Sequence, residues 1–208
     1  SYSDVLGSSQ GWASGIINNR RLKEEFNRFY NRTNSFSFGV CNGCQLMARL
    51  GWIPYKPVLK HNKSGRFESR YVTVKIHKSP SIMLSNLEDT TVGIWIAHGE
   101  GRFVSELDSV LEEDLNTSLI PIRYVNNDGN ITSQYPFNPN GSAHGIASIC
   151  SDNGRHLAMM PHPERCFLNW QMPWMSAEVK RKIKKYTPWF MMFKNAYNWC
   201  INTETSYI

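Results

Sequence analysis

The sequence has no long hydrophobic run, no internal repeat and no stretch of low complexity. Its 208 residues contain no apolar segment of the roughly 20 residues that a bilayer-spanning helix needs. There is no G-x-x-x-x-G-K-[ST] phosphate loop, and Gly99-Glu100-Gly101 lacks the spacing of a dinucleotide fingerprint. We therefore expect one globular domain with no membrane segment and no ATP site of its own. The hydrophobic content of 41% is ample for its core.

Cysteines are few and do not form a disulfide framework. There are five, an odd number, and this favours a reducing, cytoplasmic environment. Cys41 and Cys44 form the single C-x-x-C motif, which could be a redox pair or half of a zinc site. A zinc site needs two more ligands, and the other cysteines each stand alone. The sequence therefore predicts no metal site, and the redox pair stays open as an alternative.

The most informative motif is Gly39-Val40-Cys41-Asn42-Gly43. Residues 35–40 alternate like a strand and residues 45–50 fit a helix, so Cys41 falls at the junction. We expect a strained backbone there, with glycines at 39 and 43 because a Cβ at either position would crowd the turn. The thiol should point outward beside the helix N-terminus, whose partial positive charge favours thiolate. Cys41 is therefore a candidate nucleophile.

A second motif, His162-Pro163-Glu164, lies far down the chain. Prolines at 161 and 163 hold the backbone extended, so the side chains of His162 and Glu164 project to one side. Glu164 can then accept a hydrogen bond from one imidazole nitrogen while the other faces a thiol. Taken alone, the motif is more often an ordinary loop. Together with Cys41 it predicts a Cys-His-Glu triad.

At these two motifs the chain resembles the class I (triad) glutamine amidotransferases, whose pattern is G-x-C-x-G-x-Q followed much later by H-P-E. Further segments resemble the branch of this family that serves purine biosynthesis. They are residues 1–7, 64–70, 97–101, 134–142 and 160–165.

The resemblance implies an α/β, flavodoxin-like fold with a central, mostly parallel sheet flanked by helices and a smaller β-rich part. Residues 1–208 would form a single glutaminase domain, in the C-terminal part of a large single-chain enzyme. The opening strand-helix-strand portion, and a glycine-rich loop that supplies a second oxyanion donor, would precede Ser1 and be missing from the chain.

The resemblance also implies an activity. Cys41 would attack the side-chain amide of glutamine, His162 would relay protons, Glu164 would orient the imidazole, and ammonia would pass to a synthetase domain. That domain would convert formylglycinamide ribonucleotide to its amidine with ATP and Mg²⁺, and the glutaminase domain would need no cofactor. The residues that would form the oxyanion or substrate-binding site are Asn42, Gly43, Gln45, His98, Gly99 and Glu100.

Two other functions remain open. The net charge of +6 and the basic run at residues 180–185 could indicate nucleic-acid binding, although no aromatic residues are interleaved with the run. The same turn could also serve a cysteine hydrolase or another amidotransferase. We expect no nucleic-acid partner and no membrane partner.

Apolar periodicity predicts the remaining elements. A helix should bury Leu22, Phe26, Phe29 and Tyr30, and strands should cover residues 71–76, 92–96 and 120–125. A hairpin should join residues 146–150 to 156–160 around Asp152-Asn153-Gly154. A closing helix should begin at Thr187-Pro188 and bury Trp189, Phe193, Ala196 and Tyr197.

Overall fold

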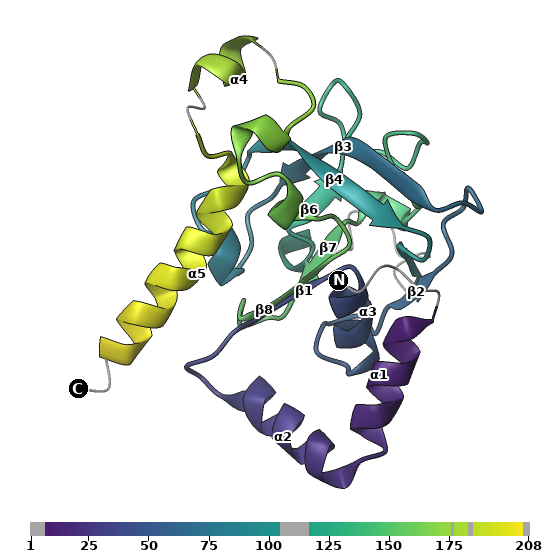
Figure 1. Ribbon diagram of the computed structural model, residues 1–208, viewed down its shortest axis with the longest axis vertical. Helices are drawn as coiled ribbons and strands as arrows, with labels where there is room; N and C mark the ends of the chain where they lie inside the picture. The colour runs from purple at the N-terminus through teal and green to yellow at the C-terminus, as the bar shows by residue number, and fades with distance from the viewer. Residues whose placement is uncertain (1–6, 105–116, 176, 183–184, 206–208) are drawn as a thin grey trace.

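The computed structural model describes residues 7–104, 117–175, 177–182 and 185–205, and these form a mixed α/β structure (Figure 1). The helices are α1 (Ser8–Ile17), α2 (Arg20–Asn31), α3 (Asn42–Arg49), α4 (Ala177–Lys182) and α5 (Pro188–Thr205). The strands are β1 (Ser37–Val40), β2 (Val58–Lys60), β3 (Glu68–Ile76), β4 (Thr91–His98), β5 (Arg102–Val104), β6 (Ile122–Tyr124), β7 (Ser148–Cys150) and β8 (His156–Met159). The expected α/β class is confirmed.

The sheet that carries the candidate nucleophile has the strand order β1-β8-β7. Strands β1 and β8 are parallel, from Ser37 opposite His156 to Val40 opposite Met159. Parallel strands end at the same edge, so Cys41 and the chain that leads to His162 emerge side by side. Strands β7 and β8 form the expected hairpin, with Gly154 at φ 70° in its turn.

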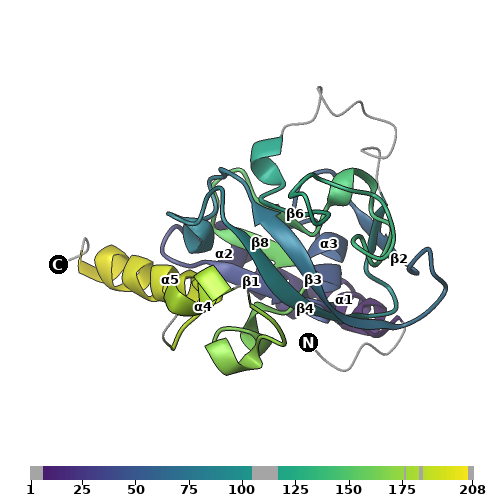
Figure 2. The ribbon, with the colours of Figure 1, turned by 90° about the horizontal axis from the view of Figure 1, so that it is seen from above.

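Parallel pairing within the described residues is confined to β1 and β8. The other sheets are antiparallel, with the orders β4-β3-β6 and β2-β5. The reason lies in the connections: β7 and β8 are joined by a tight turn, whereas β1 and β8 lie far apart in the sequence, and a parallel pair needs such a long connection. Seen from above, β3 and β4 run side by side across the molecule (Figure 2).

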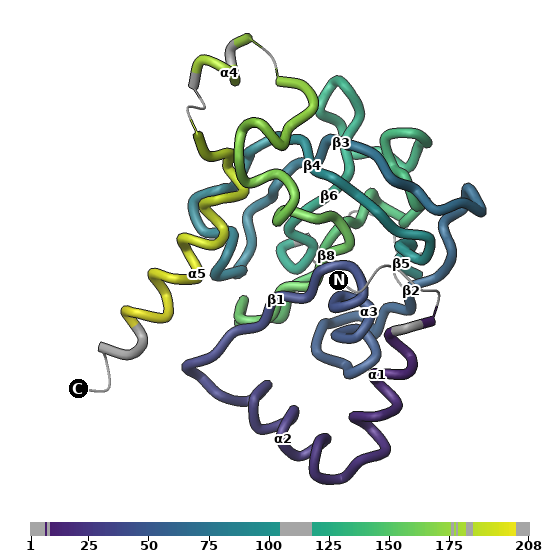
Figure 3. Tube along the Cα trace, viewed as in Figure 1, coloured from purple at the N-terminus to yellow at the C-terminus, as the bar shows by residue number. Residues whose placement is uncertain are grey.

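Two hydrophobic clusters support these sheets. One gathers Val74, Ile94 and Tyr124 of the β4-β3-β6 sheet with Trp189 of α5. The other packs Cys44 and Met47 of α3 against Ile149 and Ala158 of β7 and β8. Figure 3 traces the chain from the N-terminal helices to α5, which runs along the opposite side of the molecule. No helix among the described residues is both long and apolar enough to cross a membrane.

The expected burial of two helices is only partly right. In α2, Phe26, Phe29 and Tyr30 surround Trp52, but Leu22 is 42% exposed. Helix α5 begins at Pro188 as predicted.

The burial predicted for Tyr197 in α5 is wrong, because its side chain is 66% exposed. The buried face of α5 is centred on Trp189, Met192 and Ala196. At about 100° per residue, Tyr197 lies beyond the edge of that face.

Candidate active site

Cys41 sits on a sharp strand-to-helix turn between β1 and α3. It is the residue that caps α3, and its backbone has φ 53° and ψ −108°, a conformation that non-glycine residues rarely adopt. Its N–H donates to Met159 O at 2.9 Å, and its C=O accepts from Gln45 N at 3.0 Å. Such strain costs about 1–3 kcal/mol and persists only where the surroundings fix it. The predicted nucleophile turn is therefore present.

The thiol does not point outward as expected. Cys41 is fully buried, and its Sγ lies 3.8 Å from Ala97 O on β4. No local pattern indicates that the end of β4 covers this turn, because Ala97 and Cys41 are 56 residues apart. The N-terminal end of α3 lies next to Cys41, where its partial positive charge would stabilise a thiolate once the proton is removed.

The two glycines that flank Cys41 have different roles. A Cβ on Gly39 would lie 2.4 Å from Met47 Sδ and 2.7 Å from Gly43 O, so close packing of α3 on β1 requires glycine there. A Cβ on Gly43 would meet nothing within 4 Å. The prediction that a side chain at position 43 would crowd the turn is therefore wrong.

We expect Gly39→Ala to lower the stability of the domain by about 1–3 kcal/mol, because the added methyl meets backbone as well as a side chain. Gly43→Ala is the matched control, and it should be neutral or slightly stabilising, because alanine is the better helix former. The thermal unfolding midpoints of the two variants, measured beside the unsubstituted protein, test this. Equal losses in both would contradict the packing argument.

His162 and Glu164 form a short pair at the edge where β8 ends. His162 Nδ1 and Glu164 Oε1 are 2.6 Å apart, and His162 N donates to Trp95 O at 2.8 Å. Burial alone would raise the pKa of Glu164, but the hydrogen bond with His162 and the charges of His162 and Arg165 outweigh it and lower that pKa. The carboxylate therefore accepts the Nδ1–H and fixes the ring.

The other ring nitrogen of His162 is available for chemistry. His162 is fully buried, and its Nε2 has no hydrogen-bond partner among the described residues. Cys41 Sγ lies beside Ala97 O, and His162 N donates to Trp95 O, two residues earlier on the same strand. Two residues of a strand span roughly 7 Å, so the carbonyls of Trp95 and Ala97 are about that far apart. Strand β4 thus brings the two predicted catalytic residues to one place.

Cys44 does not share the environment of a reactive thiol. It is fully buried, and burial, followed by the neighbouring Cys41, raises its pKa well above the usual value. All five cysteines are free, and no three His, Cys, Asp or Glu side chains in the described parts of the chain are grouped as metal ligands would be. A protonated thiol is a poor metal ligand and a poor redox partner.

We expect Cys44→Ser to keep glutamine-dependent activity within about threefold of the unsubstituted enzyme, because the thiol of Cys44 stays protonated. Steady-state rates with saturating glutamine measure this. A loss as large as that of Cys41→Ala would bring back the redox-pair alternative.

The residues of α3 after Cys41 hold a loop in place. Asn42 Nδ2 donates to Gln45 Oε1 at 3.0 Å, and Gln45 Nε2 donates to Glu100 O at 2.8 Å. The Glu100 carboxylate in turn accepts from Gly7 N at 2.9 Å. Gln45 is 2% exposed. That Gln45 contacts a substrate stays a prediction, and its visible role is to join α3 to the loop after β4.

His98, the last residue of β4, and Gly99 after it lie inside a polar cluster. His98 is fully buried, and burial, followed by the charge of His162, lowers its pKa to about 3. Its Nε2 lies 3.2 Å from Asn140 Nδ2. Asn62 donates from Nδ2 to His98 O at 2.7 Å and from its backbone N–H to Gly99 O at 2.9 Å. Sequence reasoning missed Asn62 and Asn140 as parts of the site, although residues 134–142 were among the segments that resemble the purine branch of the family.

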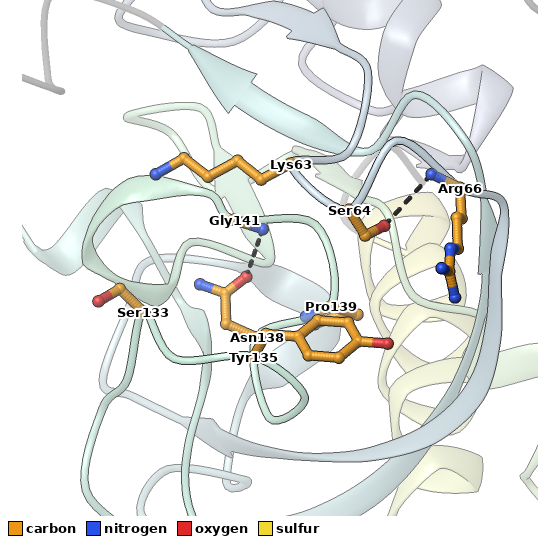
Figure 4. Close-up of a pocket in the computed structure, with 8 residues that line it drawn as sticks. All are labelled: Lys63, Ser64, Arg66, Ser133, Tyr135, Asn138, Pro139 and Gly141. Carbon is orange, nitrogen blue, oxygen red and sulfur yellow. Dashed lines mark hydrogen bonds between the residues drawn. The ribbon is translucent and has the colours of Figure 1, made fainter.

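Two cavities adjoin this region. One, of about 380 Å³, lies between Lys63 and Arg66 on one side and the segment from Ser133 to Gly141 on the other (Figure 4). In the close-up the side chains of Lys63 and Arg66 diverge, and the ring of Tyr135 lies beside Asn138 and Pro139 on the other side. The second, of about 350 Å³, is lined in part by Gln45 and Glu100. Neither is lined by Cys41 or His162, which are both fully buried, whereas the Glu164 side chain is 42% exposed.

Comparisons with known proteins agree with this geometry. Residues 1–200 match the model of the CobB/CobQ-like glutamine amidotransferase domain. The chain is 50% identical over 210 residues to phosphoribosylformylglycinamidine synthase of Dictyostelium discoideum, covering 96% of this chain and 16% of that protein. It is 42% identical over 219 residues to the human enzyme of the same name, covering 97% of this chain and 16% of that protein.

A relative in Arabidopsis thaliana is 51% identical over 209 residues, covering 96% of this chain and 15% of that protein. Its name is probable phosphoribosylformylglycinamidine synthase, chloroplastic/mitochondrial. The chain thus spans only about a sixth of the length of these relatives.

A chain in the structure of PurLQS from Thermotoga maritima aligns with a TM-score of 0.62 at 22% identity, covering 90% of this chain and 72% of that one. This likeness supports the fold. The match of the family model to nearly the whole chain, together with a cysteine on a strained turn and a paired His162 and Glu164, shows that the chain belongs to the CobB/CobQ-like glutamine amidotransferase domains.

Proposed function

We propose that Cys41, His162 and Glu164 hydrolyse glutamine to glutamate and ammonia through a cysteinyl thioester. The observation that carries the proposal is that two groups from different parts of the chain both contact β4. These are a cysteine held at φ 53° at the head of α3, and a histidine whose Nδ1 is bound by a carboxylate and whose Nε2 has no partner among the described residues. A nucleophile, a base and the group that orients the base are the parts that acyl transfer requires.

In the first half of the reaction, His162 Nε2 takes the proton of the Cys41 thiol. The thiolate attacks the side-chain amide carbon of glutamine, and a tetrahedral oxyanion forms. Collapse of this intermediate breaks the C–N bond, and the imidazolium protonates the nitrogen so that ammonia leaves. Glu164 stabilises the imidazolium throughout, because its Oε1 remains on Nδ1.

In the second half, His162 takes a proton from water, and the hydroxide attacks the glutamyl thioester. Glutamate leaves, and His162 returns the proton to the Cys41 thiolate. No metal or organic cofactor takes part in the proposed steps.

The oxyanion and substrate groups lie around the head of α3 and the end of β4. The backbone N–H of Asn42 is the proposed oxyanion donor, and Gly43 leaves open space beside it. The segment of His98, Gly99 and Glu100 is proposed to line the glutamine site, because Gln45 ties it to α3 through the 2.8 Å bond to Glu100 O.

We propose that residues 1–208 act as the glutaminase part of a larger polypeptide, and that glutamine and the synthetase domain of that polypeptide are its partners. The support is the length of the relatives, of which the chain covers 15–16%. The relatives are named for the synthesis of phosphoribosylformylglycinamidine, so ammonia would be used there, with ATP and Mg²⁺ bound by the synthetase domain. The five free cysteines fit a reducing compartment, which we take to be the cytoplasm.

Covalent labelling tests the proposed chemistry. The intact enzyme is treated with a glutamine-like diazo-ketone amino acid, and the adduct is located by peptide mapping and mass spectrometry. Single labelling at Cys41 that excess glutamine prevents is the expected result. Labelling elsewhere, or cleavage of peptides without hydrolysis of glutamine, would favour a different cysteine hydrolase.

A further inference from the structure

Asn140 is the centre of a buried hydrogen-bond network, and its amide orientation is fixed. Its Oδ1 accepts from Ser142 N at 3.0 Å and from Ser142 Oγ at 2.7 Å, while its Nδ2 donates to Gly101 O at 2.9 Å. A backbone N–H can only donate and a backbone C=O can only accept. The oxygen and nitrogen of the Asn140 amide therefore cannot be exchanged.

This orientation determines which nitrogen of His98 carries the proton. Asn140 Nδ2 has two hydrogens and cannot accept. One goes to Gly101 O, and we assign the other to His98 Nε2 at 3.2 Å over the longer contact with the Tyr124 hydroxyl at 3.3 Å, so Nε2 accepts and bears no proton. A neutral imidazole then carries its single proton on Nδ1. The depressed pKa of His98, about 3, agrees that the ring is neutral at physiological pH.

The protonated Nδ1 faces away from the network. A Cβ on Gly101 would lie 2.1 Å from His98 Cδ2 and 2.3 Å from Nε2, so that edge of the ring packs on Gly101. Nδ1 belongs to the opposite edge. His98 Nδ1 is buried and has no hydrogen-bond partner among the described residues. Nε2 of the nearby His162 also has no hydrogen-bond partner among them. An unpaired buried donor is costly, which indicates that a ligand supplies its acceptor.

We propose that Asn140 is a positioning residue that holds His98 as the Nδ1-protonated tautomer, and that His98 Nδ1–H donates to an oxygen of bound glutamine. The inference rests on the proposed glutaminase function. We take that oxygen to be one of the α-carboxylate, whose charge does not change during the reaction, so the donor binds substrate and transition state alike. Its loss therefore raises KM and leaves kcat nearly unchanged.

Two substitutions of His98 in the full-length enzyme separate this role from a purely structural one. The amide nitrogen of asparagine can take the place of Nδ1 and donate. The side-chain amide of a glutamine placed at position 98 reaches the place of Nε2. There it can accept from Asn140, but it offers no donor at the Nδ1 position. We expect His98→Gln to raise the KM for glutamine about 10- to 100-fold, and His98→Asn to raise it no more than about threefold. The reverse order would overturn the proposal, because it would mean that His98 only satisfies Asn140.

A double-mutant cycle tests the part assigned to Asn140. We expect Asn140→Ala to raise the KM for glutamine about tenfold in the unsubstituted enzyme, and to add nothing in the His98→Asn background, where no tautomer has to be fixed. Tyr124→Phe is the matched control. It removes a hydroxyl 3.3 Å from Asn140 Nδ2 and leaves the contact with His98 intact, so KM should not change. A persistent effect in the double variant, or an equal effect of Tyr124→Phe, would overturn the positioning role.

Synthesis with added ammonium, measured for every variant, confirms that the rest of the enzyme is intact. Failure of this inference is distinct from failure of the proposed function. If Cys41→Ala still uses glutamine, the proposed function itself is wrong. If Cys41→Ala loses glutamine use while His98→Gln keeps a normal KM, only the role of His98 and Asn140 is wrong.

Discussion

Replacing Cys41 with alanine is expected to abolish glutamine-dependent synthesis, with a loss of about 10⁴-fold or more, while synthesis from added ammonium continues. The three other buried cysteines cannot substitute. Cys44 is buried with a raised pKa, and burial raises the pKa of Cys150 and Cys166 to about 12. Initial rates with glutamine and with ammonium as nitrogen source measure both halves of this prediction.

Cys150→Ala is the matched control for this experiment. Cys150 is also fully buried, but it lies on β7, away from the head of α3. Both activities should survive that substitution. If Cys41→Ala lost the ammonium reaction as well, the two sites would not be separate, and if it kept the glutamine reaction, Cys41 would not be the nucleophile.

Glu164→Gln is expected to lower kcat for glutamine about 10²- to 10⁴-fold, with KM changed no more than about threefold. The carboxylate only accepts, so it holds the proton of His162 on Nδ1. A glutamine side chain can turn its N–H₂ toward Nδ1 and stabilise the tautomer in which Nε2 is protonated and cannot act as a base. It also removes the negative charge that supports the imidazolium.

Arg165→Gln provides the control, because Arg165 Nε lies 3.6 Å from the same carboxylate oxygen on a half-exposed side chain. Such exposed pairs contribute little, and kcat should stay within about threefold. An unchanged kcat in Glu164→Gln would remove Glu164 from the mechanism. Equal losses in the two variants would mean that the local charge matters and the hydrogen bond does not.

Local sequence patterns predicted the elements around the site well. The strand before Cys41, the helix after it, the hairpin of β7 and β8, and the strands of the antiparallel sheet all formed where alternation and turn residues placed them. These features depend on residues close together in the chain, where periodicity and backbone preference decide the outcome. The burial of Tyr197 was wrong, because burial depends on the element that packs against a helix.

The sequence by itself determined the candidate residues for the proposed chemistry: a cysteine between two glycines, a histidine two residues from a glutamate, and few other candidates to compete. Only the tertiary structure decided how these groups are arranged. Pairing of β1 with β8 and the covering end of β4 bring Cys41 toward His162 and bury the thiol. The packing of α3 on β1 decides that Gly39, and not Gly43, has to be glycine. The contact of Asn140 with His98 joins residues 42 positions apart, and no local pattern in the chain encodes a contact made by packing.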